Sequence, residues 1–385
     1  MSGEERPDVK PARPWFSSGP TAKRPGWAIA ALPTGLLGRG IRDPGVVARF
    51  AEGLDLTRRV LGVPDDWALV YVPGSDTGAV EAALWNLLGE RPVQVMAFEN
   101  FGKVWATDVR DHLGLEPEIL DAPWGRFPDV SRVDPKADLV FPWNGTTSGV
   151  CAPCADWIAN DREGLVICDA TSAAFAMALP WERLDVVTFS FQKALGGEAG
   201  LGVAALSPRA IQRLDSYVPP RPVPKVLRLR NDEGFDRALA TGSMINTFSV
   251  LTLEDWIDAL EWAQRVGGLA ALIARTEASA AALDAWVERT DWIDWLAEEP
   301  GTRSTTSVCL KIIDPRVVAM DEGRRRGLVT RMKTLLEGEG AAFDVEGHRN
   351  APAGLRVWCG CTVDTADIEA LTPWLDWAFV TAIAE

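Results

Sequence analysis

The sequence predicts an α/β fold in which a large domain with a mainly parallel sheet is followed by a smaller C-terminal α/β domain. Two observations carry this prediction. From residue 66 onward, short apolar runs alternate with longer amphipathic stretches, and 385 residues are enough for two domains. Apolar strands that alternate with helices are typical of a parallel sheet covered on both faces.

The elements of the large domain follow from these runs. Strands are expected at 68–72, 93–98, 139–142, 165–168, 186–191 and 202–206, with helices between them, for example at 78–88 and 105–113. A further helix is expected to start near Thr252, where Thr-Leu-Glu-Asp resembles a capping box, and to stop at the glycine pair 267–268. We place the domain boundary there, giving a large domain of residues 16–267.

The small domain is expected to comprise residues 268–385. Its helices should lie at 269–288, around 329–337 and from 364 onward, and its strands at 307–313 and 355–359. Residues 1–15 are expected to form an arm that packs on this domain. The segment 217–231, with four prolines among basic residues, is interpreted as an ordered surface excursion or a lid.

The composition of the chain argues against several classes of partner and site. The chain has 39 basic and 54 acidic residues and a formal charge of −15, which argues against nucleic acid and anionic membranes as partners. Neither an apolar stretch of about 18 residues nor a signal-peptide core is present, so we expect a cytoplasmic protein. Six cysteines are expected as free thiols. Cys151 and Cys154 have the spacing of half a zinc knuckle, but Cys359 and Cys361 do not supply the other half and the chain has only two histidines, so we expect no metal site.

Candidate functional residues follow the strands, because ligands of such sheets bind at the carboxyl ends. After the strand at 68–72 comes the turn Pro-Gly-Ser-Asp-Thr-Gly at 73–78 and then a helix. Such a turn directs N–H groups at one point and suits a phosphate. A plain tight turn is the alternative, and no Gly-Lys-Ser/Thr follows to make it a Walker motif.

Two charged residues end the next strands of interest. Asp169 follows the strand at 165–168 and could hold a metal, a ribose or a protonated ring nitrogen, or simply cap a helix. Lys193 follows the strand at 186–191 and precedes glycines, which is unusual for a surface lysine, although a snorkelling side chain is the alternative. Each residue alone is weak evidence for a site.

Together, a phosphate turn, a carboxylate and a lysine 24 positions later meet the requirements of pyridoxal phosphate. Asp169 would keep the pyridine nitrogen protonated, so that the ring accepts electrons. Lys193 would form an imine with the cofactor and, once displaced by substrate, transfer a proton. Desolvation near other cations would lower the pKa of Lys193 enough to leave a free amine.

From Trp15 to about Ala382 the chain resembles the phosphoserine aminotransferases, which are fold-type I transaminases with a large sheet of the seven-stranded type. The matching stretches are Phe-Ser-Ser-Gly-Pro at 16–20, Gly-Ser-Asp-Thr-Gly at 74–78, Asn-Gly-Thr at 144–146, Gln-Lys at 192–193, Gly-Ser-Met-Ile-Asn-Thr at 242–247, Gly-His-Arg at 347–349 and Leu-Arg-Val-Trp-Cys-Gly at 355–360.

The resemblance implies roles for individual residues around pyridoxal phosphate. The cofactor phosphate would be held by Ser75, Asp76, Thr77 and Gln192, and, from a neighbouring subunit, by Asn246 and Thr247, so a homodimer is implied. Thr146 would bond to the phenolic oxygen and Asp169 to the ring nitrogen, with Lys193 as the attachment point. Phe101 would stack on the ring, with Trp105 as the alternative.

The resemblance also implies the substrates, which are glutamate and a phosphorylated three-carbon acid. Arg356 would bind the α-carboxylate, and Ser18 would lie in the substrate site. The distal phosphate would be bound by Arg42, His348 and Arg349. The implied reaction transfers the amino group of glutamate to 3-phosphohydroxypyruvate and forms O-phosphoserine for serine biosynthesis.

One departure from the family's pattern concerns the distal phosphate. Relatives usually carry Ser-His-Arg where this chain has Gly-Ile-Arg at 40–42, so Ile41 replaces a phosphate-binding histidine. Losing a charged hydrogen bond costs about 1.5–3 kcal/mol. An alternative is therefore a diverged relative that acts on another anionic keto or amino acid, or that performs lyase or β-replacement chemistry on a serine derivative.

Overall fold

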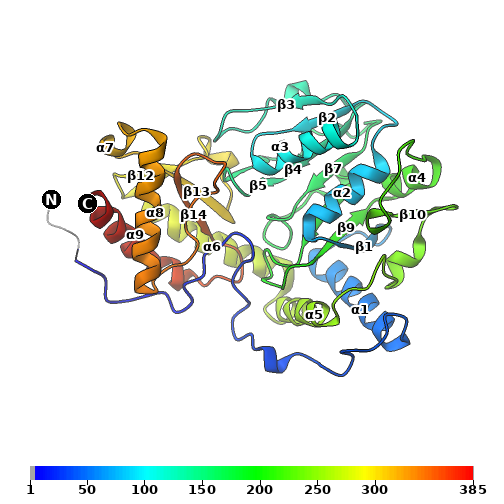
Figure 1. Ribbon diagram of the computed structural model, residues 1–385, viewed down its shortest axis with the longest axis horizontal. Coiled ribbons are helices and arrows are strands. Elements are labelled where there is room, and N and C mark those ends of the chain that lie inside the picture. The colour runs from blue at the N-terminus through cyan, green and yellow to red at the C-terminus, as the bar shows by residue number, and fades with distance from the viewer. Residues whose placement is uncertain (1–4, 385) are drawn as a thin grey trace.

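The computed structural model describes residues 5–384, which form a large and a small lobe (Figure 1). The large lobe is built on a seven-stranded sheet with the strand order β1-β9-β8-β7-β4-β2-β3. Its strands are β1 (Ala68–Pro73), β2 (Val93–Met96), β3 (Glu118–Leu120), β4 (Asp138–Pro142), β7 (Val166–Asp169), β8 (Val186–Ser190) and β9 (Leu201–Leu206).

The sheet is parallel except at β9, which is antiparallel to both of its neighbours, β1 and β8. Since β9 runs opposite to both, β1 runs in the same direction as β8. The carboxyl ends of β1, β8, β7, β4, β2 and β3 therefore lie along one edge. All six predicted strands are present, and the prediction of a mainly parallel sheet is confirmed. The seventh, β3, is a short and partly exposed edge strand without an apolar run.

Helices cover both faces of the sheet. The side chains of β1 point alternately to the two faces, and those on each face need a helical layer to bury them. Leu69 and Tyr71 pack into a core with α1 (Pro44–Leu61) and α5 (Val250–Arg265). Val70 and Val72 face the other core, which contains the helices α2 (Ser75–Leu87), α3 (Asn100–Thr107) and α4 (Pro208–Ser216). A π-helical turn, Asp108–His112, continues α3.

The start of α5 differs from the prediction. The helix begins at Val250, and its N-cap is Ser249, whose side chain accepts a hydrogen bond from the backbone N–H of Thr252. Thr252 thus lies in the first turn and is not the cap. Ser249 is preferred because its hydroxyl satisfies one of the N–H groups that lack intrahelical partners.

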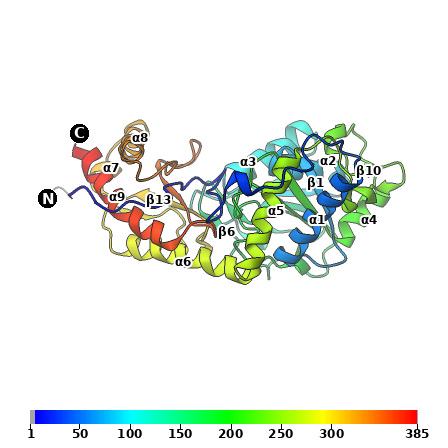
Figure 2. The ribbon, with the colours of Figure 1, turned by 90° about the horizontal axis from the view of Figure 1, so that it is seen from below.

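The small lobe contains a three-stranded antiparallel sheet in the order β12-β13-β14. Its elements are α6 (Gly268–Glu288), β12 (Ile293–Trp295), β13 (Ser307–Ile312), α7 (Pro315–Val318), α8 (Glu322–Glu339), β14 (Gly354–Trp358) and α9 (Thr365–Ala384). Figure 2 shows α6 running from the end of α5 into the small lobe, with a bend of 88° between the two helices. The domain boundary at 267 stays a prediction.

The N-terminal segment lies along the small lobe. Trp374 Nε1 of α9 donates to the carbonyl of Val9 (2.8 Å), and the N–H of Ala12 donates to Asp367 (2.7 Å). Short two-stranded pairs complete the described fold, namely β5 (Asn144–Gly145) with β6 (Val150–Cys151) and β10 (Arg230–Asn231) with β11 (Gly234–Phe235). Within residues 5–384, no single helix is long and apolar enough to cross a membrane, although α5 and α6 pass that test as a bent pair.

Candidate active site

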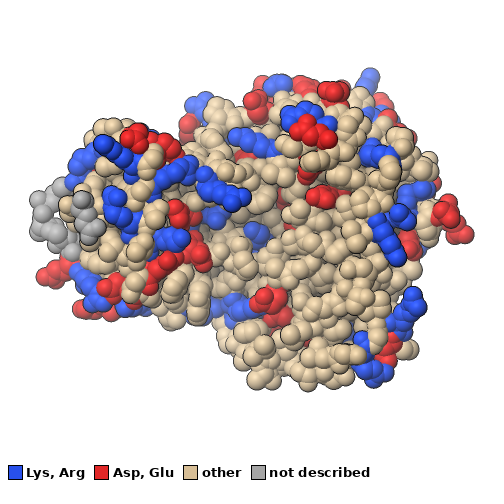
Figure 3. All heavy atoms as spheres, viewed as in Figure 1, with Lys and Arg blue, Asp and Glu red and all other residues tan. Residues whose placement is uncertain are grey.

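The carboxyl-end edge of the large sheet gathers the chemically distinctive residues. Asp169 is the last residue of β7, and Lys193 follows the neighbouring parallel strand β8. Thr146 follows β4, and the N-terminus of α2 follows β1. Figure 3 shows a recess between the two lobes with Lys and Arg side chains at its border. These residues thus lie at the edge of the sheet where ligands of such sheets bind.

The turn before α2 has the geometry of an anion site. Gly74 and Ser75 have positive φ angles (86° and 56°), and their N–H groups donate to the carbonyl of Gly200. Gly78 must be glycine, because a Cβ there would lie 1.8 Å from the carbonyl oxygen of Pro73. The N–H groups of Asp76 and Thr77, which follow in the first turn of α2, lack intrahelical acceptors, and the helix dipole favours an anion there.

Asp76 lies in this turn, but its side chain points away from it. Asp76 is 6% exposed, and its carboxyl contacts that of Asp169, so it turns toward the sheet. A carboxylate would in any case repel a phosphate. The part of Asp76 that can serve a phosphate is therefore its backbone N–H, while Ser75 and Thr77 can offer hydroxyls as well.

Asp169 is held by two N–H donors. Trp105 Nε1 donates to its Oδ2 (3.1 Å), and the N–H of Thr171 donates to its Oδ1 (3.0 Å). Trp105 is 2% exposed, and its one side-chain N–H donor is used in this bond. The bond was not predicted from the sequence. Phe101, one turn earlier, is only partly buried, and its ring centroid lies 6.3 Å from that of His348. This arrangement favours Phe101 over Trp105 as the residue that stacks on a bound ring.

The amine of Lys193 donates to the carbonyl of Ser18 (2.5 Å), and the Ser18 hydroxyl is 3.1 Å from that of Ser307 in the small lobe. Burial and, next, the positive charge of Arg356 lower the pKa of Lys193 from 10.5 to about 8. Near neutral pH a useful fraction of this amine is therefore unprotonated and nucleophilic.

Gly19 makes room for this lysine. A Cβ at Gly19 would lie 2.3 Å from Lys193 Nζ, and the φ angle of +154° is one that other residues rarely adopt. We expect Gly19→Ala to displace the amine and to slow cofactor attachment about 10²-fold, since misplacing a reacting group by about 1 Å has effects of this size. The rate can be followed by absorbance. Gly35→Ala is the matched control, because nothing lies within 4 Å of a Cβ there, and equal rates for both variants would contradict the expectation.

Arg356 faces the site from β14 of the small lobe. Its Nη1 lies 3.5 Å from the carbonyl of Thr146, and its buried Nε has no hydrogen-bond partner among the described residues. The Thr146 hydroxyl itself donates to Ser172 (2.8 Å). A guanidinium that has a buried N–H donor without a partner is suited to binding a carboxylate through two hydrogen bonds.

His348 and Arg349 precede β14 on a loop that is tied to α3, where Asn350 Nδ2 donates to Asn100 (2.7 Å). Burial, followed by the charges of Arg356 and Arg349, lowers the pKa of His348. The charge of Lys193 also lowers the pKa of His348, so His348 lies close enough to Arg356, Arg349 and Lys193 to interact with their charges. A cluster of cationic groups thus exists at the site despite the acidic surface, which suits an anionic substrate.

Three predicted site residues stay outside this assembly. Among residues 5–384, no hydrogen bond or ion pair connects Arg42, Asn246 or Thr247 to the strand-end residues. Arg42 is exposed before α1, and Asn246 donates only to the carbonyl of Thr247. Gln192, in contrast, is beside Lys193 and has a buried side-chain oxygen without a described partner.

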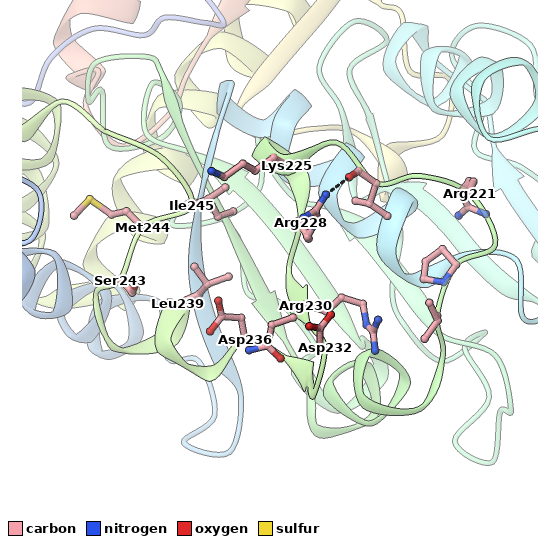
Figure 4. A pocket seen from close by; sticks show the side chains of 14 residues that line it. Arg221, Lys225, Arg228, Arg230, Asp232, Asp236, Leu239, Ser243, Met244 and Ile245 are labelled. Atoms are coloured by element: carbon pink, nitrogen blue, oxygen red, sulfur yellow. Dashed lines mark hydrogen bonds between the residues drawn. The ribbon is translucent and has the colours of Figure 1, made fainter.

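The segment 217–231 does not cover the site of its own chain. Arg221 donates to the carbonyl of Leu88 (2.7 Å), as does Tyr217 (3.2 Å), which anchors the segment at the C-terminal end of α2. The turn that faces Lys193 is at the opposite end of that helix. A pocket of about 570 Å³ lies between this segment and residues 243–245. Figure 4 shows several basic side chains around it.

Comparison with known proteins supports the same interpretation. No family model matches the chain. A phosphoserine aminotransferase from Methanosarcina mazei is 46% identical over 375 residues, which is 97% of this chain and 99% of that protein. The chain belongs to the phosphoserine aminotransferase family.

Solved structures of this family show the same fold-type I architecture. A phosphoserine aminotransferase from Cytophaga hutchinsonii superimposes with a TM-score of 0.80 at 20% identity, covering 94% of this chain and 98% of that one. The enzyme from Trichomonas vaginalis, solved with pyridoxal phosphate bound, has a TM-score of 0.73 at 18% identity, with 94% and 98% coverage.

Proposed function

We propose that this protein is a pyridoxal-phosphate-dependent transaminase that converts 3-phosphohydroxypyruvate and glutamate to O-phosphoserine and 2-oxoglutarate, the transamination of serine biosynthesis. The observation that carries this proposal is the convergence of Lys193, Asp169 and the N-terminus of α2 at one sheet edge, in a chain that belongs to the phosphoserine aminotransferase family. No observation favours lyase or β-replacement chemistry.

The described residues fit the cofactor. The α2 turn, with Ser75 and Thr77, offers donors for a phosphate, and Gln192, beside Lys193, would add its side-chain N–H₂ group. Thr146 would serve the phenolic oxygen, Phe101 the ring face and Asp169 the ring nitrogen. When bound, pyridoxal phosphate supplies an aldehyde and an electron-withdrawing ring.

The chain's own residues would perform the remaining tasks. Lys193 holds the proton that moves to and from the substrate α-carbon, since its lowered pKa lets the amine act as a base near neutrality. Arg356 binds the α-carboxylate and orients the substrate. His348 and Arg349 bind the distal phosphate, and Ser18 keeps the lysine amine in place through its carbonyl.

The reaction can be tested in two halves. Adding glutamate to the cofactor-loaded protein should change its visible absorbance, and subsequent 3-phosphohydroxypyruvate should restore the spectrum and yield phosphoserine, detected by mass spectrometry. The same assay with hydroxypyruvate, which lacks the phosphate, measures how much activity depends on binding of the phosphate in the distal pocket with Ile41. Failure to form phosphoserine would refute the proposal.

A homodimer with shared sites would explain the position of Asn246, Thr247 and Arg42. Among the described residues, no hydrogen bond or ion pair joins them to the site of their own chain, and a second copy could bring them to its partner's site. In a homodimer related by two-fold symmetry, each chain would then complete the site of the other.

Mixed dimers test this arrangement. Lys193→Ala is expected to inactivate one site, and a double variant of Asn246→Ala and Thr247→Ala should weaken the site of its partner. Mixing the two, after reversible dissociation, should restore about a quarter of wild-type activity, because half of the dimers would contain one complete site. Activity that does not exceed the sum of the separate variants would argue against shared sites.

The lowered pKa of Lys193 predicts a pH dependence. The free amine is the nucleophile, and it is the form present above a pKa of about 8, whereas an ordinary lysine has a value of 10.5. The rate at which the cofactor-free protein takes up pyridoxal phosphate should therefore rise with pH and reach half of its maximum near pH 8. Stopped-flow absorbance measures this rate, and a midpoint above pH 10 would contradict the expectation.

A further inference from the structure

The feature of interest is the carboxyl of Asp76, which none of the predicted roles uses. Asp76 lies in the first turn of α2, yet its side chain is buried between that helix and the sheet. It contacts the carboxyl of Asp169 on β7 and lies near Thr188 on β8, whose hydroxyl has no hydrogen-bond partner among the described residues. Asp169 and Thr188 are paired neighbours in the two parallel strands, so the three side chains form one compact cluster.

Two carboxyl groups in hydrogen-bonding contact share a proton, because two buried negative charges at that distance repel strongly. The partners of each group show where the proton resides. Asp169 already accepts hydrogen bonds from Trp105 and Thr171, both of which stabilise its negative charge. The buried Oδ1 of Asp76 has no donor among the described residues. Asp76 is therefore the group that keeps the proton.

The charges around Asp76 agree with this assignment. Burial raises the pKa of Asp76 well above its usual value, and Asp169 raises it further, while Thr188 and the more distant Lys193 lower it. The neighbouring thiol of Cys168 is buried and neutral, since burial raises its pKa. The surroundings of Asp76 thus favour its neutral form.

We infer that Asp76 is a positioning residue that stays protonated and donates a hydrogen bond to Asp169, so that the proton between Asp169 and the ring nitrogen of the cofactor remains on the nitrogen. The inference rests on the proposed use of pyridoxal phosphate. Its physical basis is that each hydrogen bond to the Asp169 carboxylate stabilises the anion. With three donors Asp169 competes less for the ring proton, and the ring keeps the positive charge that withdraws electrons.

Two substitutions separate hydrogen bonding from simple packing. Asp76→Asn keeps a donor of similar size, and Asp76→Leu removes it. The first measurement is the infrared spectrum of the cofactor-free protein at neutral pH, in which a protonated carboxyl has its own C=O stretching band. We expect this band to be lost in Asp76→Asn. Glu99→Gln is the matched control, because Glu99 is a second buried carboxyl with a pKa raised to about 7, and its loss should remove a different band.

The second measurement is the ¹⁵N chemical shift of the ring nitrogen in protein loaded with labelled cofactor. The wild type and Asp76→Asn should both show a protonated nitrogen, whereas Asp76→Leu should shift toward the unprotonated value. An infrared spectrum unchanged by Asp76→Asn, or a shift in Asp76→Leu equal to that of the wild type, would overturn the inference. Should Asp76→Leu not fold, Asp76→Asn alone decides it through the infrared band.

The two proposals fail in distinguishable ways. If the wild-type protein does not take up pyridoxal phosphate, the proposed function is wrong, and the inference falls with it. If the wild-type protein binds the cofactor and forms phosphoserine but Asp76→Asn loses no carboxyl band, only the inference is overturned.

Discussion

Replacing Lys193 with alanine is expected to lower the turnover of glutamate and 3-phosphohydroxypyruvate by at least about 10³-fold. The substitution removes both the amine that attaches the cofactor and the base that moves the substrate proton, and general base catalysis alone contributes about 10²- to 10⁴-fold. The lowered pKa of Lys193 supports the proposed role of this lysine as the nucleophile of the site.

The measurement is kcat from a coupled assay, together with absorbance after glutamate is added. Lys136→Ala serves as the matched control, since Lys136 is an exposed lysine of the same lobe. Circular dichroism checks that both variants fold like the wild type. A Lys193→Ala protein with activity within tenfold of the wild type would refute the proposed role of this residue.

The fold was largely predictable because buried parallel strands carry a strong local signal. The runs that became β1, β4, β7 and β8 are buried at nearly every position, and such runs are apolar regardless of their partners. The helix α1 was not predicted, although its ends carry recognisable signals. The side chain of Asp43 caps it, Pro44 is its first residue, and Gly62 ends it with a φ of 71°. The direction of β9 could not be predicted, because strand pairing depends on tertiary contacts.

Some features of the candidate site were likewise predictable from the sequence, and others were not. Residues placed by a strand end, such as Asp169 and Lys193, were singled out from the sequence, since the topology brings those ends together. The direction of a side chain within a turn was not, and Asp76 is the example: its backbone belongs to the phosphate turn, while its carboxyl joins Asp169. The bond from Trp105 to Asp169 spans 64 positions and depends on how α3 packs on the sheet.

The second large effect is expected at Asp169. Asp169→Ala should lower kcat by about 10²- to 10⁴-fold, because removing one partner of a buried charge pair costs about 3–5 kcal/mol, and each 1.36 kcal/mol is tenfold in rate. Without the carboxylate the ring nitrogen loses its proton and withdraws electrons poorly. Cofactor attachment should persist, since the amine of Lys193 and the α2 turn are intact, so absorbance can confirm that the variant is loaded.

A cofactor analogue distinguishes this electrostatic role from a structural one. Pyridoxal phosphate methylated at the ring nitrogen keeps its positive charge without a proton, and it should restore part of the activity of Asp169→Ala, with the space for the methyl group provided by the missing carboxylate. The wild type should gain nothing from the analogue, because its carboxylate leaves no such space. A loaded Asp169→Ala protein that the analogue does not rescue would indicate that Asp169 acts mainly by holding Trp105 and Thr171 in position, since those are the groups that bind it.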